Sequence, residues 1–241
     1  VSDGMTINIL LAEFNALYNG VQLPEQTLHY KEYSQWQAGR DLSKQRDYWV
    51  TQFDQDVPVL DLPLDYPRPQ KQSFDGCTVS ANINPDMRKR INSFATSKQA
   101  TEYMVLLSGL MVLLGRYSRQ DDSVVGSPIS GRIHRDCERM PGMFVNSLAM
   151  RGRPEKGKTF QQLLGEIKQS SLAAYENQEY PFEELVDQLD LPRDLSRNPL
   201  FDVMMALQNN EETKAELQSI DLLSVETKVD TAKFDLTVNI S

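Results

Sequence analysis

Apolar residues recur along the chain with two periods, and these periods predict alternating helices and strands. Apolar residues spaced three and four apart predict helices at residues 5–18, 45–53, 84–98, 101–117, 159–178 and 182–189. Short β-branched or alternating runs predict strands at residues 78–83, 123–129, 143–150, 201–207, 219–225 and 234–240. This order predicts a mixed sheet packed with helices, an α/β (α+β) two-layer sandwich.

Local signals set the ends of the first helix and the environment of a later one. Ser2 or Asp3 is expected to cap the helix at residues 5–18, because a short side-chain oxygen accepts from the free N–H groups of a first turn. The helix at residues 101–117 is apolar nearly all round, which predicts burial against the sheet.

Residues 57–74 contain four prolines and show no helical period. Proline fixes its own φ and pushes the preceding residue toward an extended backbone. This stretch is therefore expected to be an extended crossing segment, and it is the best domain boundary that the pattern offers.

Residues 123–151 form two apolar runs around a polar loop, which carries Arg132, His134, Arg135, Asp136, Glu138 and Arg139. Polar loops on a rigid scaffold often hold binding or catalytic groups. A solvated, hairpin-like connection is the other interpretation, and the pattern alone favours it.

Charge and cysteine content narrow the class of protein. The 241 residues include 34 acidic and 25 basic side chains, a net charge of −9, which argues against nucleic acid or an anionic membrane as a partner. No apolar run is long enough to span a bilayer, and no signal peptide is visible. The spacing of Cys77 and Cys137 is not that of a metal site. Free thiols in a reducing cytoplasm are the favoured interpretation, and a disulfide between the two is the alternative.

Motifs for common chemistries are absent: the sequence has no GxGxxG, phosphate loop, HExxH or GxSxG. His29 is interpreted as a packing or surface residue. His134 is a candidate general base, but no triad partner lies near it in the sequence. A hydrolase is therefore poorly supported, and no metal site is predicted.

Four stretches, in this order, resemble the condensation domains of nonribosomal peptide synthetases: VSDG (1–4), SPISGR…GMFVN (127–146), YPFEELVDQL (180–189) and SRNPLFDVM (196–204). The resemblance covers essentially the whole chain and implies the chloramphenicol-acetyltransferase-like fold. The family's defining motif is His-His-x-x-x-Asp-Gly, and VSDG matches its end. Both histidines would then precede the first residue, so the sequence is expected to be a piece cut at both ends and inactive alone.

The resemblance also implies an activity. Condensation domains join a donor acyl or peptidyl thioester to an acceptor aminoacyl thioester, both held on phosphopantetheine arms of carrier proteins, in a tunnel between two similar lobes. Residues 1–65 would end the N-terminal lobe, and residues 66–241 would form a truncated C-terminal lobe. The implied partners are donor and acceptor peptidyl carrier domains and an adjacent adenylation domain, with no directly bound cofactor. The alternative is a non-catalytic lobe that docks carrier or adenylation domains.

The resemblance implies roles for the residues of this chain that match the family's motifs. Asp3 would be the motif aspartate, held by a structural salt bridge to Arg132, because a guanidinium can bind a carboxylate with two hydrogen bonds. Gly4 would permit a tight turn near substrate, and Asn146 would face the reacting groups. The catalytic candidates are Asp3, Gly4 and Asn146, and the tunnel candidates are Ser2, Ser130, Gly131 and Asn146.

The two later motifs are expected to be mainly structural. Pro181 would start a helix, with Phe182 packing behind it, and residues 196–200 would form a supported turn. Arg197 is also a candidate for binding phosphate or a carboxylate. The sequence SDGMTINIL, together with GSPISGR and GMFVN, is closer to domains that accept a D-configured donor, or to starter and dual types, than to ordinary L-to-L domains.

Overall fold

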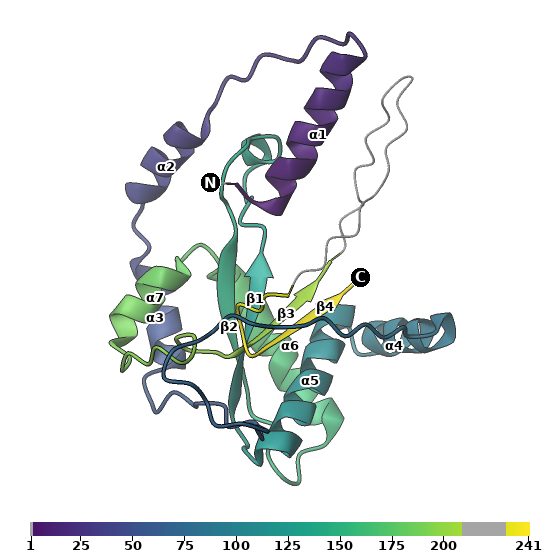
Figure 1. Cartoon of the computed structure of the whole chain (residues 1–241), viewed down its shortest axis with the longest axis vertical. Coiled ribbons are helices and arrows are strands. Elements are labelled where there is room, and N and C mark those ends of the chain that lie inside the picture. The colour runs from purple at the N-terminus through teal and green to yellow at the C-terminus, as the bar shows by residue number, and fades with distance from the viewer. Residues whose placement is uncertain (1, 209–229) are drawn as a thin grey trace. The chain divides into compact units, whose positions relative to one another are not determined.

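The computed structural model describes residues 2–208 and 230–241. Within them the elements are α1 (Gly4–Tyr18), α2 (Tyr30–Ala38), α3 (Ser43–Gln52), α4 (Pro85–Ser97), α5 (Glu102–Ser118), β1 (Ser123–Ile129), the 3₁₀ turn η1 (Arg135–Cys137), β2 (Asn146–Gly152), α6 (Phe160–Glu176), α7 (Phe182–Leu189), β3 (Val203–Leu207) and β4 (Leu236–Ile240). In Figure 1, helices α5 and α6 lie beside the sheet. The predicted mixed α/β architecture is confirmed.

The sheet has four strands in the order β2-β1-β3-β4. β3 runs parallel to both of its neighbours: Val125 of β1 pairs with Val203, and Val203 pairs with Leu236 of β4. The strands predicted at residues 123–129, 201–207 and 234–240 are therefore present, with small shifts at their ends. The strand predicted at residues 219–225 lies outside the described residues.

Helices α5 and α6 pack together against the sheet, as Figure 1 shows. At Gly152 of β2 an added Cβ would lie 2.1 Å from Met111 Sδ of α5 and 2.9 Å from Ile167 Cδ1 of α6. Met111 and Ile167 are almost fully buried, as the pattern at residues 101–117 predicted for α5. Only a residue without a side chain allows the two helices to approach the strand so closely.

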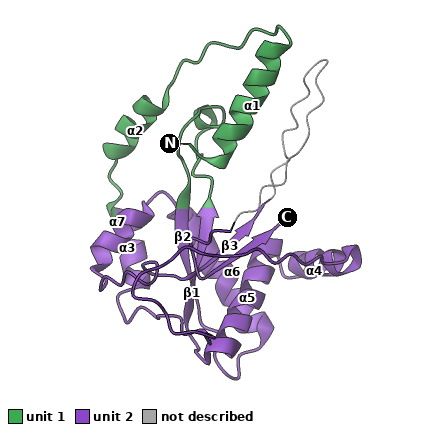
Figure 2. Cartoon of the chain, in the orientation of Figure 1, with its two compact units in different colours: residues 1–43, 129–146, 209–228 green, residues 44–128, 147–208, 229–241 purple. Residues whose placement is uncertain are grey.

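Two compact units divide the chain (Figure 2). In its described part, unit 1 comprises residues 2–43 and 129–146. Unit 2 comprises residues 44–128, 147–208 and 230–241 and contains most of the sheet. These units are discontinuous in sequence, and the lobe boundary after residue 65, which the resemblance implies, stays a prediction.

The proline-rich segment is extended, as predicted, and has neither helix nor paired strand between residues 57 and 74. It lies within unit 2, where Gln72 N donates to Leu195 O and Phe74 O accepts from Ala232 N. The segment continues as a single bridge between Asp75 and Thr231. It is therefore tied to two later parts of the chain.

Two strand predictions need correction. Residues 78–83 form no strand, since all of them are exposed and no described residue pairs with them, so alternation there buries no face. The strand predicted at residues 143–150 begins only at Asn146. The backbone just before it is used elsewhere: Phe144 N donates to Asp3 Oδ2.

Helix α1 forms as predicted, but the described residues leave much of its apolar face uncovered. Ile7, Leu10, Phe14 and Leu17 are each more than half exposed. Within residues 2–208 and 230–241, every helix is too short or too polar to span a membrane.

Candidate functional site

Asp3 caps helix α1 from a buried position. Its backbone is extended (φ −98°, ψ 175°), and its Oδ1 accepts from Thr6 N at 2.8 Å and from Thr6 Oγ1 at 2.7 Å. The first turn of a helix has free N–H groups, and an aspartate at the cap satisfies one of them. The sequence allowed Ser2 or Asp3 as the cap, and the structure selects Asp3.

Arg132 meets this carboxylate from the polar loop after β1. Its Nη2 lies 2.9 Å from Asp3 Oδ1 and 3.0 Å from Oδ2, and the side chains are 2% and 1% exposed. The other terminal nitrogen, Nη1, donates to Cys137 O and, at 2.7 Å, to Met140 O. One guanidinium thus joins the carboxylate to the turn at residues 137–140, so the structure brings the two predicted partners together.

Thr6 and Gly142 close the network on its far side. Thr6 Oγ1 has one hydrogen, which it shares between Asp3 Oδ1 at 2.7 Å and Gly142 O at 2.8 Å, and it accepts from Gly142 N at 3.0 Å. Asp3 N donates to Gly142 O at 3.2 Å. Sequence reasoning missed Thr6, because a capping box would place Glu or Gln at this position and threonine gives no such signal. It also gave no role to Gly142 within the quoted GMFVN motif.

Burial and hydrogen bonding have opposite effects on the pKa of the Asp3 carboxyl. Burial alone would raise the pKa of its carboxyl. The hydrogen bonds from Thr6, Arg132 and Phe144 N outweigh burial and hold the pKa below its ordinary value. Asp3 is therefore an anchored anion that accepts five hydrogen bonds, which suits a structural role better than proton transfer.

Gly131 is required by the course of this loop. Its φ is +64°, and an added Cβ would lie 1.8 Å from Phe144 O. The next residue, Arg132, places its guanidinium carbon 4.2 Å from the centre of the Phe144 ring. The loop can reach Asp3 only because residue 131 has no side chain.

The other predicted site residues are placed as follows. Ser2 and Ser130 are exposed, next to Asp3 and Gly131 respectively. Asn146 is half-buried and begins β2. Gly4 is the first residue of α1; a Cβ there would meet no atom within 4 Å, so the structure itself gives no tight turn that requires glycine.

The later motifs build the interior of unit 2. Pro181 precedes the first residue of α7, and the Phe182 ring packs 5.1 Å from that of Phe201, between centroids. Arg197 Nη2 donates to Leu60 O at 3.2 Å and lies 3.4 Å from Asp202 Oδ2. The carboxylate that Arg197 binds is thus one of this chain's own.

The two histidines occupy different surroundings. His29 is the N-cap of α2 and donates its backbone N–H to Glu32 Oε2 at 2.9 Å. His134 directly precedes η1, and its ring meets the Trp36 ring edge-on at 5.0 Å. Among the residues that the structure describes, no carboxylate holds either imidazole ring as it would hold a catalytic base.

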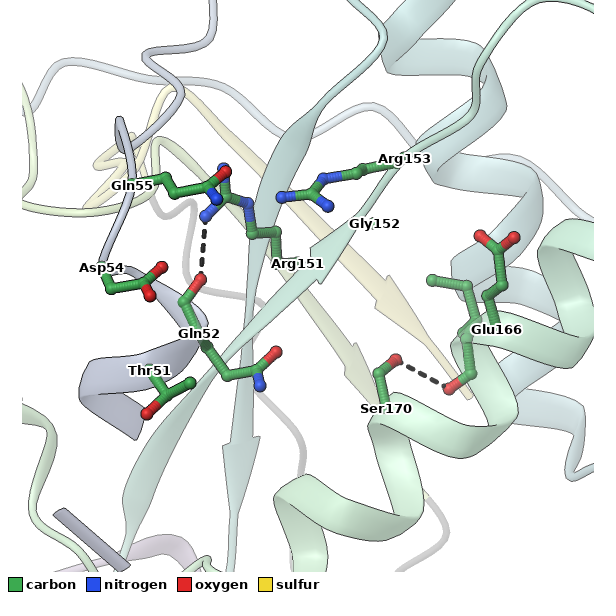
Figure 3. A pocket seen from close by; sticks show the side chains of 10 residues that line it. Thr51, Gln52, Asp54, Gln55, Arg151, Gly152, Arg153, Glu166 and Ser170 are labelled. Carbon is green, nitrogen blue, oxygen red and sulfur yellow. Dashed lines mark hydrogen bonds between the residues drawn. The ribbon is translucent and has the colours of Figure 1, made fainter. Parts of the chain in front are cut away.

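A separate polar pocket of about 340 Å³ lies in unit 2 (Figure 3). It is lined by Thr51, Gln52, Asp54, Gln55, Arg151, Gly152, Arg153, Glu166, Ile167 and Ser170. Arg151 donates to Gln52 O at 2.8 Å, as the dashed line shows, and pairs with Asp122 at 2.7 Å. Its donors are therefore already engaged by the chain. Among the described residues no group of three or more His, Cys, Asp or Glu side chains is arranged to hold a metal ion.

Solved structures of similar fold include an X-domain and a condensation domain. The X-domain from teicoplanin biosynthesis superposes with a TM-score of 0.87 at 22% identity over 98% of this chain and 56% of that one. The condensation domain from the Monacolin K polyketide synthase MokA superposes with a TM-score of 0.76 at 23% identity, over 86% and 51%. At these identities the likeness defines the class of fold, the chloramphenicol-acetyltransferase-like architecture that the motifs implied.

Sequence comparison then establishes the family. The family model described as "Condensation domain" matches residues 1–241, and this chain belongs to that family. It is 47% identical to gramicidin S synthase 2 of Brevibacillus brevis and 46% identical to tyrocidine synthase 3 of Brevibacillus parabrevis. Both matches cover 99% of this chain but only 6% and 4% of those synthetases.

Proposed function

We propose that this chain is the part of a condensation domain that anchors the end of the catalytic motif and forms one wall of the substrate tunnel. The domain would form an amide between a donor acyl or peptidyl thioester and an acceptor aminoacyl thioester. Both substrates would be carried on phosphopantetheine arms of peptidyl carrier domains, next to an adenylation domain. The cytoplasm remains the expected location.

The buried pair of Asp3 and Arg132 is the observation that carries this proposal. It fixes the Asp-Gly end of the motif onto the SPISGR and GMFVN loops. Fixing that backbone to within a fraction of an ångström matters, because an amine and a thioester react only when closely aligned. In this proposal Asp3 acts through position, and the proton transfer falls to the motif histidines of the family.

The remaining motif residues would supply polar contacts to the substrates. Asn146, at the start of β2, would hydrogen-bond a reacting carbonyl or amine through its amide. Ser2, Ser130 and Gly131 would line the tunnel beside the anchored pair. Residues 1–65 would close the N-terminal lobe and residues 66–241 would belong to the C-terminal lobe.

A chimera tests the proposal. These 241 residues would replace the matching stretch of a condensation domain of gramicidin S synthase 2, which supplies the complete motif. Two loaded carrier proteins are added, and the dipeptidyl thioester is measured by mass spectrometry. We expect condensation, and we expect Asn146→Ala to lower kcat without unfolding the domain. A folded chimera that binds loaded carriers but forms no product would overturn the catalytic assignment.

Docking without catalysis is the second candidate. A structure of similar fold, at 23% identity, is a complex of the teicoplanin X-domain with OxyB, so this architecture can serve in binding a partner. If this chain is such a lobe, the chimera would bind carrier or adenylation domains with ordinary affinity and never turn over. The same assay therefore separates the two functions.

A further inference from the structure

Helix α2 presents three aromatic side chains on one face. Tyr30, Tyr33 and Trp36 are spaced three residues apart, which places them along one side of a helix. The ring centroids of Tyr30 and Tyr33 are 5.9 Å apart, and those of Tyr33 and Trp36 are 5.8 Å apart. The rings form a continuous row that the proposed chemistry does not use.

This row packs against the residues that hold the Asp3–Arg132 pair. The Phe144 ring meets Tyr30 edge-on at 5.1 Å and Tyr33 at 4.6 Å. Tyr30 Oη also donates to Met143 O at 2.6 Å. Phe144 in turn lies under the Arg132 guanidinium.

Gly142 shows how tightly the loop is enclosed. Its backbone N and O are bonded to Thr6 Oγ1, on the α1 side. A Cβ on Gly142 would lie 2.2 Å from Tyr30 Cδ2, on the α2 side. The strip Gly142–Phe144 is therefore held between the first turn of α1 and the aromatic face of α2.

The Trp36 ring contacts an earlier part of the same loop. Trp36 meets His134 edge-on, two residues after Arg132, and the Arg40 guanidinium lies 4.6 Å from the Trp36 ring centre. A cation over an aromatic face is attracted by the ring's electrons and restricts its movement. Helix α2 thus contacts the loop both before η1 and after it.

We propose that α2 sets the geometry of the anchored motif, with Tyr30 and Tyr33 as positioning residues that act through Phe144 on Arg132 and Asp3. Tyr30 fixes residues 142–144 by its hydroxyl and ring, so that Phe144 N points at Asp3. Tyr33 presses the Phe144 ring onto the guanidinium. The proposal rests on the proposed function for its effect on turnover, but not for its effect on Asp3.

Tyr30→Phe in the chimeric domain tests this, because it removes the bond to Met143 O and keeps the ring. We expect kcat for condensation to fall roughly tenfold while KM for each loaded carrier stays within about twofold, as a loss of alignment predicts. The Asp3 carboxyl, followed by ¹³C NMR and assigned with Asp3→Asn, should titrate at higher pH. Tyr66→Phe, the same change at an 83% exposed tyrosine, is the matched control.

Tyr33→Leu provides a second measurement by removing the ring that presses on Phe144, and it should shift the Asp3 titration in the same direction. If the chimera never condenses, the proposed function fails, but the Asp3 titration still decides the role of α2. Unchanged titration and unchanged kcat in folded Tyr30→Phe and Tyr33→Leu domains would overturn the proposal. A change in unfolding temperature alone, with neither of these readouts moving, would also overturn it.

Discussion

The Arg132 side chain binds several groups at once. It replaces water around a buried carboxylate and binds two backbone carbonyls. Removing one member of a buried pair leaves the other charge without compensation, which costs more than the pair itself contributes. We expect this loss to affect folding, since the guanidinium donates to groups of the chain itself.

Arg132→Ala should therefore destabilise the domain by roughly 3–5 kcal/mol and impair folding more than carrier binding. Urea unfolding of the chimeric domain measures this. Arg90→Ala, on the exposed surface of α4, should change the unfolding free energy by less than about 0.5 kcal/mol. An unchanged free energy of unfolding in Arg132→Ala would contradict a structural role for the salt bridge.

Two buried aspartates give opposite pH dependences. The lowered pKa of Asp3 means that its stabilising contribution is present above the ordinary pKa of a carboxyl and is lost as pH falls through the folded-state pKa. At Asp202, burial raises the pKa from 3.8 to about 6, against the opposing effect of Arg197. Its favourable contribution is present below 3.8 and is lost as pH rises through about 6.

Asp202→Asn should remove that second slope. Between about pH 4 and pH 7 the unfolding free energy attributable to this group falls, by on the order of 2 kcal/mol, as the carboxyl ionises. Urea titrations at several pH values should show a flatter profile in the variant over this interval. The same profile in both proteins would contradict a raised pKa at Asp202.

The loop between β1 and β2 depends on glycine for two reasons that can be separated. Gly131 has a positive φ, and it also lies against Phe144 O. Gly157 has a φ of +89° with nothing within 4 Å of its Cβ position. The two positions share a positive φ, which favours glycine, and they differ in crowding.

Gly131→Ala should therefore cost clearly more than Gly157→Ala, which carries only the backbone penalty of about 1 kcal/mol. The clash would also displace the loop that carries Arg132, so a loss of condensation should accompany the loss of stability. Thermal unfolding and the condensation assay of the two chimeras compare them. Equal costs would show that Phe144 O moves aside without consequence.

Long-range ties organise unit 2 as a whole. Arg68, in the extended segment, pairs with Asp235 just before β4 and donates to Ser196 O at 3.1 Å. Gln72 and Asn198 both donate to Lys233 O. Hydrogen bonds thus join residues from three distant parts of the sequence.

Arg68→Ala should lower the unfolding free energy by about 1–3 kcal/mol, because it leaves a partly buried carboxylate and a carbonyl without their donor. Arg46→Ala is the control, since its pair with the neighbouring Asp47 is largely exposed, and such pairs contribute little. Urea unfolding measures both. A loss at Arg68 no larger than that at Arg46 would mean that the tie has no effect on stability.

The sequence by itself determined most of the elements and the family. Apolar period and capping residues placed α1, α5, α6 and α7 to within a few residues, because these signals act between near neighbours in the chain. The Asp3–Arg132 pair came from ordered motifs. No local rule joins positions 129 residues apart.

Only the tertiary structure decided which local patterns form the predicted element and which residues make long-range contacts. The alternation at residues 78–83 predicts a strand, but strands need a hydrogen-bonding neighbour, and no described residue pairs with it. Thr6, Gly142 and Tyr30 look ordinary in sequence and matter through contacts made across more than a hundred residues. Such contacts depend on where the folded backbone brings distant segments together, and periodicity along the chain carries no information about that.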